Sequence, residues 1–264
     1  MPMKTNELEV SVSIVTYNNS ENLEKRLATL LPIFKSNDIK KVYIVDNNSS
    51  DSTPKILNEL AKENPILEVI LLKSNIGFGA GHNKAIKSTD SKYHVVMNLD
   101  ATPKTEDLFQ KMSVFMENKK EIDLLSPLIL FPDSKIQHLT RNEPTVFDLM
   151  IRFLNTKLFL KRQEAFVHLK DGYDHEQKIL NATGCFMFFR TETLKKVGGF
   201  DERYFLYMED TDLTKTINLN GKAIFSPEFQ VIHEWQRSNH SIKGARKMTV
   251  SMIKYFNKWG WKII

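Results

Sequence analysis

A repeated pattern of apolar strand, polar loop and helix restricts the fold of this chain more than any other feature. Strand-like runs cover residues 10–15, 42–45, 69–72 and 94–97, and each ends at a polar segment. Helical patterns follow these segments, and such alternation favours a doubly wound α/β fold with a parallel sheet covered on both faces. Ligands of such sheets bind beyond the carboxyl ends of the strands. We therefore expect the four polar segments to converge on one cleft.

The composition predicts a globular protein that stays in the cytosol. Of the 264 residues, 41% are hydrophobic and 26% are charged. No apolar run approaches about 18 residues, the length of a membrane span. The first residues are too polar for a signal peptide, and a single cysteine, Cys185, excludes a disulfide within the chain. Cys185 lies in an apolar run, which favours a place in the core over a role as nucleophile.

The charge balance predicts anionic partners. The net charge is +5 and the pI is near 9.0, and residues 243–262 hold six of the basic residues without an acid. Nucleotides and lipid surfaces suit this charge, whereas nucleic acid is suggested by the pI alone and is not expected. Residues 248–264 also place aromatic side chains at helical spacing. This pattern predicts either a helix lying on anionic lipid or a terminal helix docked on the core.

An acidic cluster, Glu209-Asp210-Thr211-Asp212, follows a Gly-Gly pair and an aromatic run. Carboxylates this close raise one another's pKa, so one of them could accept a proton near neutral pH. The same residues also suit a helix start, where free backbone N–H groups favour negative charge. Both interpretations stay open on these residues alone.

Three further features could bind a ligand or serve only the fold. The glycine-rich loop 77–81 could bring backbone N–H groups against a nucleotide, or could be a turn that needs positive φ. Asp100, at a strand end, could bind a divalent cation or form an ordinary turn. His233 could be a metal ligand or a hydrogen-bonded histidine. No zinc motif is present.

Taken as an ordered set, five segments resemble the family 2 inverting glycosyltransferases over about residues 10–240. Within that family the chain is most similar to the rhamnosyltransferase-like branch, which builds bacterial surface polysaccharides such as O-antigen. The segments are 12–18, 45–51, 75–79 with Asn83, Asn98-Leu99-Asp100, and 198–213.

The resemblance implies a GT-A fold, in which a Rossmann-like nucleotide-binding sheet is fused to an acceptor-binding subdomain. It implies one domain over residues 1–264. Residues 8–103 would bind the nucleotide sugar, 104–240 would bind the acceptor and hold the catalytic groups, and 241–264 would form the basic aromatic C-terminal helix. A divalent cation, Mg²⁺ or Mn²⁺, would bridge the donor diphosphate.

The resemblance also implies roles for single residues. Asp210 would be the general base that deprotonates the acceptor hydroxyl, and Glu209 would bind the acceptor or tune the base. Asp100 and His233 would bind the cation. The residues that would contact the nucleotide sugar are Thr16, Tyr17, Asn18, Asp46, Asn75, Gly77, Phe78, Asn83 and Asn98.

The chain departs from the family at its Asp-x-Asp motif, where Asn98 replaces the first acid and Leu99 stands where proline is frequent. Strict dependence on a metal is therefore open. We expect transfer of L-rhamnose from a dTDP donor to a lipid-linked oligosaccharide, by a protein peripheral to the cytoplasmic face of the cell membrane. The alternatives are a UDP-hexose or UDP-N-acetylhexosamine donor, or a catalytically silent nucleotide-binding protein. Residues 132–178 have no readable pattern, so the acceptor is not identified by sequence.

Overall fold

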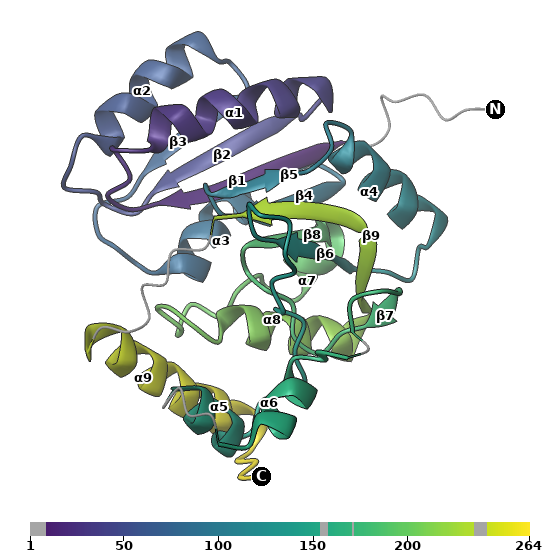
Figure 1. Cartoon of the computed structure of the whole chain (residues 1–264). Helices are drawn as coiled ribbons and strands as arrows, with labels where there is room; N and C mark the ends of the chain where they lie inside the picture. The colour runs from purple at the N-terminus through teal and green to yellow at the C-terminus, as the bar shows by residue number, and fades with distance from the viewer. Residues whose placement is uncertain (1–8, 154–157, 171, 235–241) are drawn as a thin grey trace.

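The computed structural model describes residues 9–153, 158–170, 172–234 and 242–264, which form one nine-stranded sheet with helices on both faces (Figure 1). The elements of the first half are β1 (Val10–Thr16), α1 (Leu23–Ser36), β2 (Lys41–Asp46), α2 (Thr53–Glu63), β3 (Leu67–Leu71), α3 (Phe78–Ser88), β4 (Tyr93–Met97), β5 (Ala101–Pro103) and α4 (Leu108–Asn118). Those of the second half are β6 (Leu124–Leu130), α5 (Val146–Phe153), α6 (Leu160–Phe166), β7 (Gln177–Lys178), β8 (Phe186–Arg190), α7 (Thr191–Lys196), α8 (Glu209–Asn220), β9 (Ala223–His233) and α9 (Ile242–Trp259).

The strand order is β3-β2-β1-β4-β8-β6-β9-β5, and β7 pairs with β9. The first four strands are parallel, as predicted. The complete sheet is mixed, because β8 runs antiparallel to both β4 and β6. The connection from β6 passes through α5, α6 and β7 and returns to the edge where β4 ends, because Phe186 at the start of β8 pairs with Met97. The strand β8 therefore starts at the carboxyl edge of the parallel strands, where the polar segments gather.

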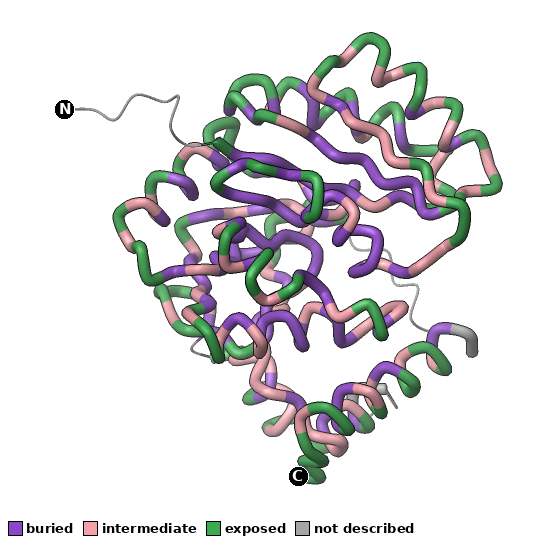
Figure 2. Tube along the Cα trace, turned by 180° about the vertical axis from the view of Figure 1, so that it is seen from behind, coloured by how far each residue is buried: buried purple, intermediate pink, exposed green. Residues whose placement is uncertain are grey.

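Alternate side chains of the central strands divide the core into two layers. On β4, Val95 and Met97 belong to the layer that packs against α1 and α4, whereas Val96 belongs to the layer of α3, α7 and α8. The central strands are buried almost throughout (Figure 2). On α1, Leu23, Leu27 and Leu30 are buried at helical spacing, as predicted. The expected helices and strands therefore form a two-sided core.

The C-terminal helix α9 lies with α5 and α6 at the end of the molecule farthest from α1 and α2 (Figure 1). Its residues Tyr255 and Phe256 are buried in a small cluster with Tyr204 and Met208. Of the two alternatives for this segment, the helix docked on the core is the one that the structure shows. No described helix combines the length and the apolar character that crossing a membrane requires.

Candidate active site

The ends of β1 and β2 hold a buried aspartate within a hydrogen-bonded loop. Asp46 is buried at the end of β2, and its carboxylate accepts hydrogen bonds from the Ser49 backbone N–H (2.9 Å) and hydroxyl (2.5 Å). The Thr16 hydroxyl lies 3.4 Å from the same carboxylate because β1 and β2 pair in register there. Two of the predicted nucleotide-binding residues are therefore adjacent.

Tyr17 and Asn18 continue from β1 into the loop that precedes α1. The Tyr17 side chain is half exposed, and Asn18 adopts positive φ. The Asn18 carbonyl oxygen Oδ1 accepts from the Ser50 N–H (2.8 Å), so this loop and the loop after β2 are held together. An exposed aromatic ring on a fixed loop can stack on a nucleotide base.

The glycine-rich loop begins with a backbone conformation that favours glycine. Gly77 has a φ of 94°, and a Cβ there would lie 2.2 Å from the Phe205 carbonyl oxygen. The Asn47 side chain donates to the Gly77 carbonyl (3.0 Å), and the Asn75 side chain accepts from the Gly77 N–H (3.1 Å). Positive φ was one of the two interpretations of this loop, and the contacts attach it to the loop after β2.

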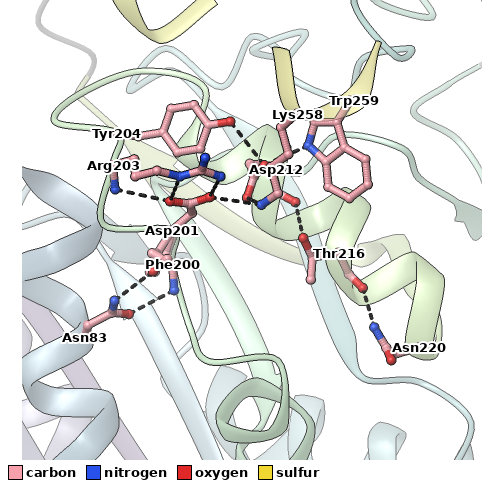
Figure 3. Close-up of polar contacts among 10 residues, drawn as sticks. All are labelled: Asn83, Phe200, Asp201, Arg203, Tyr204, Asp212, Thr216, Asn220, Lys258 and Trp259. Atoms are coloured by element: carbon pink, nitrogen blue, oxygen red, sulfur yellow. Dashed lines mark hydrogen bonds and ion pairs between the residues drawn. The ribbon is translucent and has the colours of Figure 1, made fainter. Parts of the chain in front are cut away.

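Asn83 and Phe78 lie on α3, where Asn83 contacts the loop at Phe200 and Phe78 contacts Gly184. Asn83 is buried, and its amide donates to the Phe200 carbonyl (2.8 Å) and accepts from the Phe200 N–H (2.9 Å), as Figure 3 shows. It also donates to Glu202 (3.0 Å), so both its polar atoms are engaged in holding this loop. The Phe78 ring lies close to Gly184, next to Asp210.

The second acidic site forms where β5 pairs with β9. The register Ala101↔His233 places Asp100 beside the end of β9, although 133 residues separate the two along the chain. His233 Nε2 lies 3.3 Å from Asp100 Oδ1 and 3.4 Å from Asn98 Nδ2. The histidine is buried, and Asp100 is partly exposed. The structure therefore brings together the two residues predicted to bind a cation, with Asn98 beside them.

The donor set at this site fits a divalent cation that is also bound by a ligand's phosphates. Two ligands at right angles on an octahedral ion of Mg²⁺ size lie about 3.0 Å apart, near the observed separation of 3.3 Å. Among the described residues, no group of three or more acidic, histidine or cysteine side chains could hold a metal. Such ions often take few protein ligands and complete their shell with substrate phosphates and water.

Gln137 is a buried neighbour of His233 that sequence reasoning missed. Its Nε2 donates to the His233 carbonyl (2.6 Å), and its Oε1 lies 3.1 Å from His233 Nδ1. Gln137 follows β6 in the region without a readable pattern. A lone glutamine there carries no motif, so only the fold reveals it.

The predicted general base lies at the start of α8. Asp210 is partly buried, and its carboxylate accepts from the backbone N–H of Gly184 (3.0 Å) and of Thr211 (2.7 Å). Tyr207 and Met208 precede it with positive φ, which makes a sharp turn into the helix. The cluster is therefore a helix start, and it also fixes a carboxylate that keeps access to solvent.

Glu209 has a different environment from Asp210. Its carboxyl group is buried, and its Oε2 has no hydrogen-bond partner among the described residues. Burial, with the neighbouring charge of Asp210, raises the pKa of Glu209 to about 8. The predicted rise in pKa therefore falls on Glu209, which is mostly protonated at neutral pH.

Asp212, to which the sequence assigned no role, joins α8 to α9. The carboxylate is buried and accepts from Lys258 (2.8 Å), Trp259 Nε1 (2.7 Å) and the Tyr204 hydroxyl (3.2 Å), as Figure 3 shows. Lys258 also pairs with Asp201 (3.0 Å). Asp212 therefore anchors the C-terminal helix behind the acidic cluster.

Cys185 lies between the two acidic sites. The Cys185 carbonyl accepts from the Asn98 N–H (2.9 Å), and the preceding Gly184 contacts Asp210. Burial raises the pKa of the Cys185 thiol to about 12, and the charges of Asp100 and Asp210 both add to this rise. The cysteine is buried, as predicted. Both carboxylates are therefore near one residue at the start of β8.

Fold and site together define a class: mixed α/β proteins with polar side chains gathered at the carboxyl edge of the parallel strands, here a fixed carboxylate and the Asp100–His233 pair. The sequence model described as Glycosyl transferase family 2 matches residues 11–198. The chain therefore belongs to glycosyltransferase family 2, as the resemblance predicted.

Three curated relatives are similar to the chain at low identity. The rhamnosyltransferase WbbL of Escherichia coli K12 is 26% identical over 93% of this chain and 92% of its own length. The N-acetylglucosaminyl-diphospho-decaprenol L-rhamnosyltransferase of Mycobacterium tuberculosis is 24% identical over 84% and 75%. An uncharacterised glycosyltransferase of Methanocaldococcus jannaschii is 27% identical over 60% of this chain, and the match spans only 53% of that relative.

Solved structures show the same fold. The mannosyltransferase PcManGT of Pyrobaculum calidifontis, solved with GDP-Man and Mn²⁺, has a TM-score of 0.64 at 18% identity, over 94% of this chain and 64% of that one. The predicted GT-A fold is thereby confirmed, since such glycosyltransferases share this mixed α/β sheet.

Proposed function

We propose that this protein transfers a sugar from a nucleotide-sugar donor to an acceptor hydroxyl with inversion at the anomeric carbon. The observation that carries the proposal is the Asp210 carboxylate, held by Gly184 N–H at the start of α8. It lies on the same strand edge as the Asp100–His233 pair. This arrangement offers a base on one side and binding groups for a diphosphate on the other.

In the proposed reaction Asp210 accepts the proton of the acceptor hydroxyl. The acceptor oxygen forms a bond to the anomeric carbon as the bond from that carbon to the diphosphate oxygen breaks. The nucleoside diphosphate leaves with the bonding electron pair, so one displacement inverts the configuration. Asp100 and His233 would hold a divalent cation, Mg²⁺ or Mn²⁺, whose chemistry is to neutralise charge on the diphosphate. Glu209, protonated at neutral pH, adds no second negative charge beside the base.

For the nucleotide pocket we propose the half-exposed Tyr17 as the base-stacking residue, with Thr16, Asn18 and Asp46 beside it. Asn75, Gly77 and Phe78 would close over the nucleotide. The contacts of Asn83 favour a role in positioning the Phe200 loop instead of contact with the donor. Asn98 lies beside the cation pair, with its Nδ2 3.4 Å from His233 Nε2.

For the donor we propose dTDP-L-rhamnose, and for the acceptor a lipid-linked saccharide of a bacterial surface polysaccharide. Support comes from the two rhamnosyltransferases among the relatives, one of which is named for a decaprenol-linked substrate. The GDP-Man and Mn²⁺ of the mannosyltransferase structure support a nucleotide-sugar donor and a divalent cation in general.

A donor screen tests the proposal. Thermal unfolding is followed with dTDP- and UDP-sugars in the presence of Mn²⁺, and each donor that stabilises the protein is offered an N-acetylglucosaminyl diphospholipid. We expect dTDP-L-rhamnose to stabilise the protein most and to give an inverted product. Preference for a UDP-sugar would replace the donor assignment. Binding without turnover of any donor would favour the silent nucleotide-binding alternative.

We also propose that the protein is peripheral to the cytoplasmic face of the cell membrane. Tyr255 and Phe256 of α9 are buried, so the anchoring surface that we propose consists of exposed apolar residues from two other segments: Leu158, Phe159, Leu160, Trp261, Ile263 and Ile264. These two segments meet because Phe147 donates its N–H to the Ile263 carbonyl (3.1 Å) and packs its ring on Phe159 (5.1 Å). Residues 145–170 and 242–264 contain eleven basic and two acidic residues, which suits an anionic bilayer.

Vesicle sedimentation tests this surface. The double variant Phe159→Ser with Trp261→Ser should lose binding to phosphatidylglycerol vesicles, whereas Leu219→Ser, an exposed leucine on α8, should bind like the wild type. Truncating α9 would be a poorer test because it removes buried core residues. Equal sedimentation of all three proteins would contradict the proposal.

A further inference from the structure

Two backbone carbonyl oxygens fix the orientation of the Gln137 side-chain amide. Its Nε2 lies 2.6 Å from the His233 carbonyl oxygen and 3.2 Å from the Leu130 carbonyl oxygen. Carbonyl oxygens only accept hydrogen bonds, so the NH₂ group must face them. With the amide reversed, its oxygen would face two acceptors in a buried site. Oε1 is thereby fixed toward His233 Nδ1, at 3.1 Å.

This orientation determines which ring nitrogen of His233 carries the proton. An amide oxygen cannot donate, so Nδ1 must be the donor of the hydrogen bond to Gln137. The neutral ring then has an unprotonated Nε2, which points at Asp100 Oδ1 (3.3 Å). Asn98 Nδ2, at 3.4 Å, can donate to the same lone pair. Two acceptors that face each other are stabilised by a cation between them.

The backbone around Gln137 holds it at this place. Leu130 and Ile136 form an antiparallel bridge, and the Gln137 N–H donates to the Ile129 carbonyl (2.8 Å). The chain therefore turns back beside the end of β6, next to its parallel neighbour β9. Both N–H groups and the oxygen of the buried Gln137 side chain have partners.

We propose that Gln137 is a positioning residue that holds His233 in the Nδ1–H tautomer and so prepares Nε2 to bind a divalent cation together with Asp100. The proposal rests on the proposed function only for the use of that cation, which would bind the donor diphosphate. A hydrogen bond to the outer nitrogen is the usual way in which proteins orient a ligating histidine. Replacing such a partner typically weakens metal binding about 10- to 100-fold.

Nitrogen NMR of the protein without metal measures the tautomer directly. Histidine is labelled with ¹⁵N, spectra are recorded at about pH 8.5, well above the ordinary histidine pKa of about 6.5, and His233→Gln identifies the signals. We expect a protonated Nδ1 and an unprotonated Nε2 in the wild type. A protonated Nε2 in the neutral ring would overturn the proposal. The measurement is made on the wild type, so His233→Gln is the single variant that has to fold.

Mn²⁺ titration followed by electron paramagnetic resonance, without donor, tests the consequence. Gln137→Leu should bind Mn²⁺ about 10- to 100-fold more weakly and should shift the His233 proton to Nε2. Gln110→Leu, at a partly exposed glutamine on α4, is the control and should behave like the wild type. If Gln137→Leu does not fold, Gln137→Met, which matches glutamine in length and lacks the amide, replaces it with the same expected result. Unchanged Mn²⁺ affinity in a folded Gln137→Leu, or no Mn²⁺ binding by the wild type, would overturn the proposal. A failed donor screen would instead refute the proposed function and leave the tautomer result standing.

Discussion

The buried Glu209 makes the stability of the protein depend on pH in a direction opposite to that of most carboxylates. Burial and the charge of Asp210 raise its pKa from 4.5 to about 8. Between these values the native state keeps a proton that the unfolded state has lost, so the free energy of unfolding falls as pH rises through this window. A difference of about 3.5 pH units at about 1.4 kcal/mol each sets about 5 kcal/mol as the upper bound of the loss.

Replacing Glu209 with glutamine removes this titration and keeps the shape of the neutral acid. Relative to the wild type, Glu209→Gln should gain stability as pH rises from about 5 to 8.5, by about 2–5 kcal/mol. Urea unfolding at several pH values, followed by circular dichroism, measures the gain. Glu121→Gln, at an exposed glutamate, is the matched control and should follow the wild type.

The decisive quantity is the difference between the pH profiles of Glu209→Gln and the wild type. Parallel profiles would show that Glu209 is ionised in the folded protein at neutral pH. The assignment of Glu209 as a protonated neighbour of Asp210 would then be refuted.

Three further predictions concern stability and binding. His94 and His82 are joined through Ser13 (2.9 and 2.8 Å), and burial lowers the pKa of both, to about 3 for His94. Below about pH 6.5 the unfolded state therefore binds protons at these histidines that the native state does not bind. The free energy of unfolding should fall by up to about 1.4 kcal/mol per histidine for each pH unit below about 6.5. Because Glu209 changes stability in the opposite direction over this range, the measurement uses Glu209→Gln, and a flat urea-unfolding profile of that variant from pH 6.5 to 5 would contradict the prediction. Asp212→Asn should remove the buried partner of Lys258 and lower the free energy of unfolding by about 2–4 kcal/mol. The control Asp90→Asn, at an exposed aspartate, should change it little. Equal melting temperatures for the two variants would contradict the anchoring role of Asp212. Gly77→Ala should lose donor binding because its Cβ would collide with the Phe205 carbonyl oxygen. The control Gly198→Ala changes a glycine with a similar φ of 85° and open space around it, so it should bind the donor like the wild type. Equal donor affinity of the two variants would contradict the role of the 77–81 loop in donor binding.

The sequence predicted the first half of the fold well because its signals are local. The β-branched runs, helix spacing and polar strand ends each lie within a few residues, and β1 to β4 formed as expected. The antiparallel entry of β8 was not predictable, because it depends on where the long connection after β6 returns. The sequence pattern of an isolated strand is the same in either direction.

The site shows the same contrast between local and distant contacts. Glu209 and Asp210 are neighbours, so their crowding could be recognised, but burial decides which of them is protonated. Asp100 and His233 meet through the β5–β9 register, and only the family resemblance paired them. Asp212 had no assignment because its partners, Lys258 and Trp259, lie on a helix 46 and 47 residues further along the chain. Gln137 had none because its role depends on three contacts made in the folded state.

The most direct test of the account is transfer by Asp210→Asn, measured in parallel with donor binding. The substitution keeps the size of the side chain and removes the proton acceptor. A general base typically contributes about 10²- to 10⁴-fold to the rate, so kcat should fall by at least about 100-fold while the dissociation constants of donor and Mn²⁺ stay within about threefold of the wild type. Transfer at the wild-type rate would contradict the central claim that Asp210 deprotonates the acceptor.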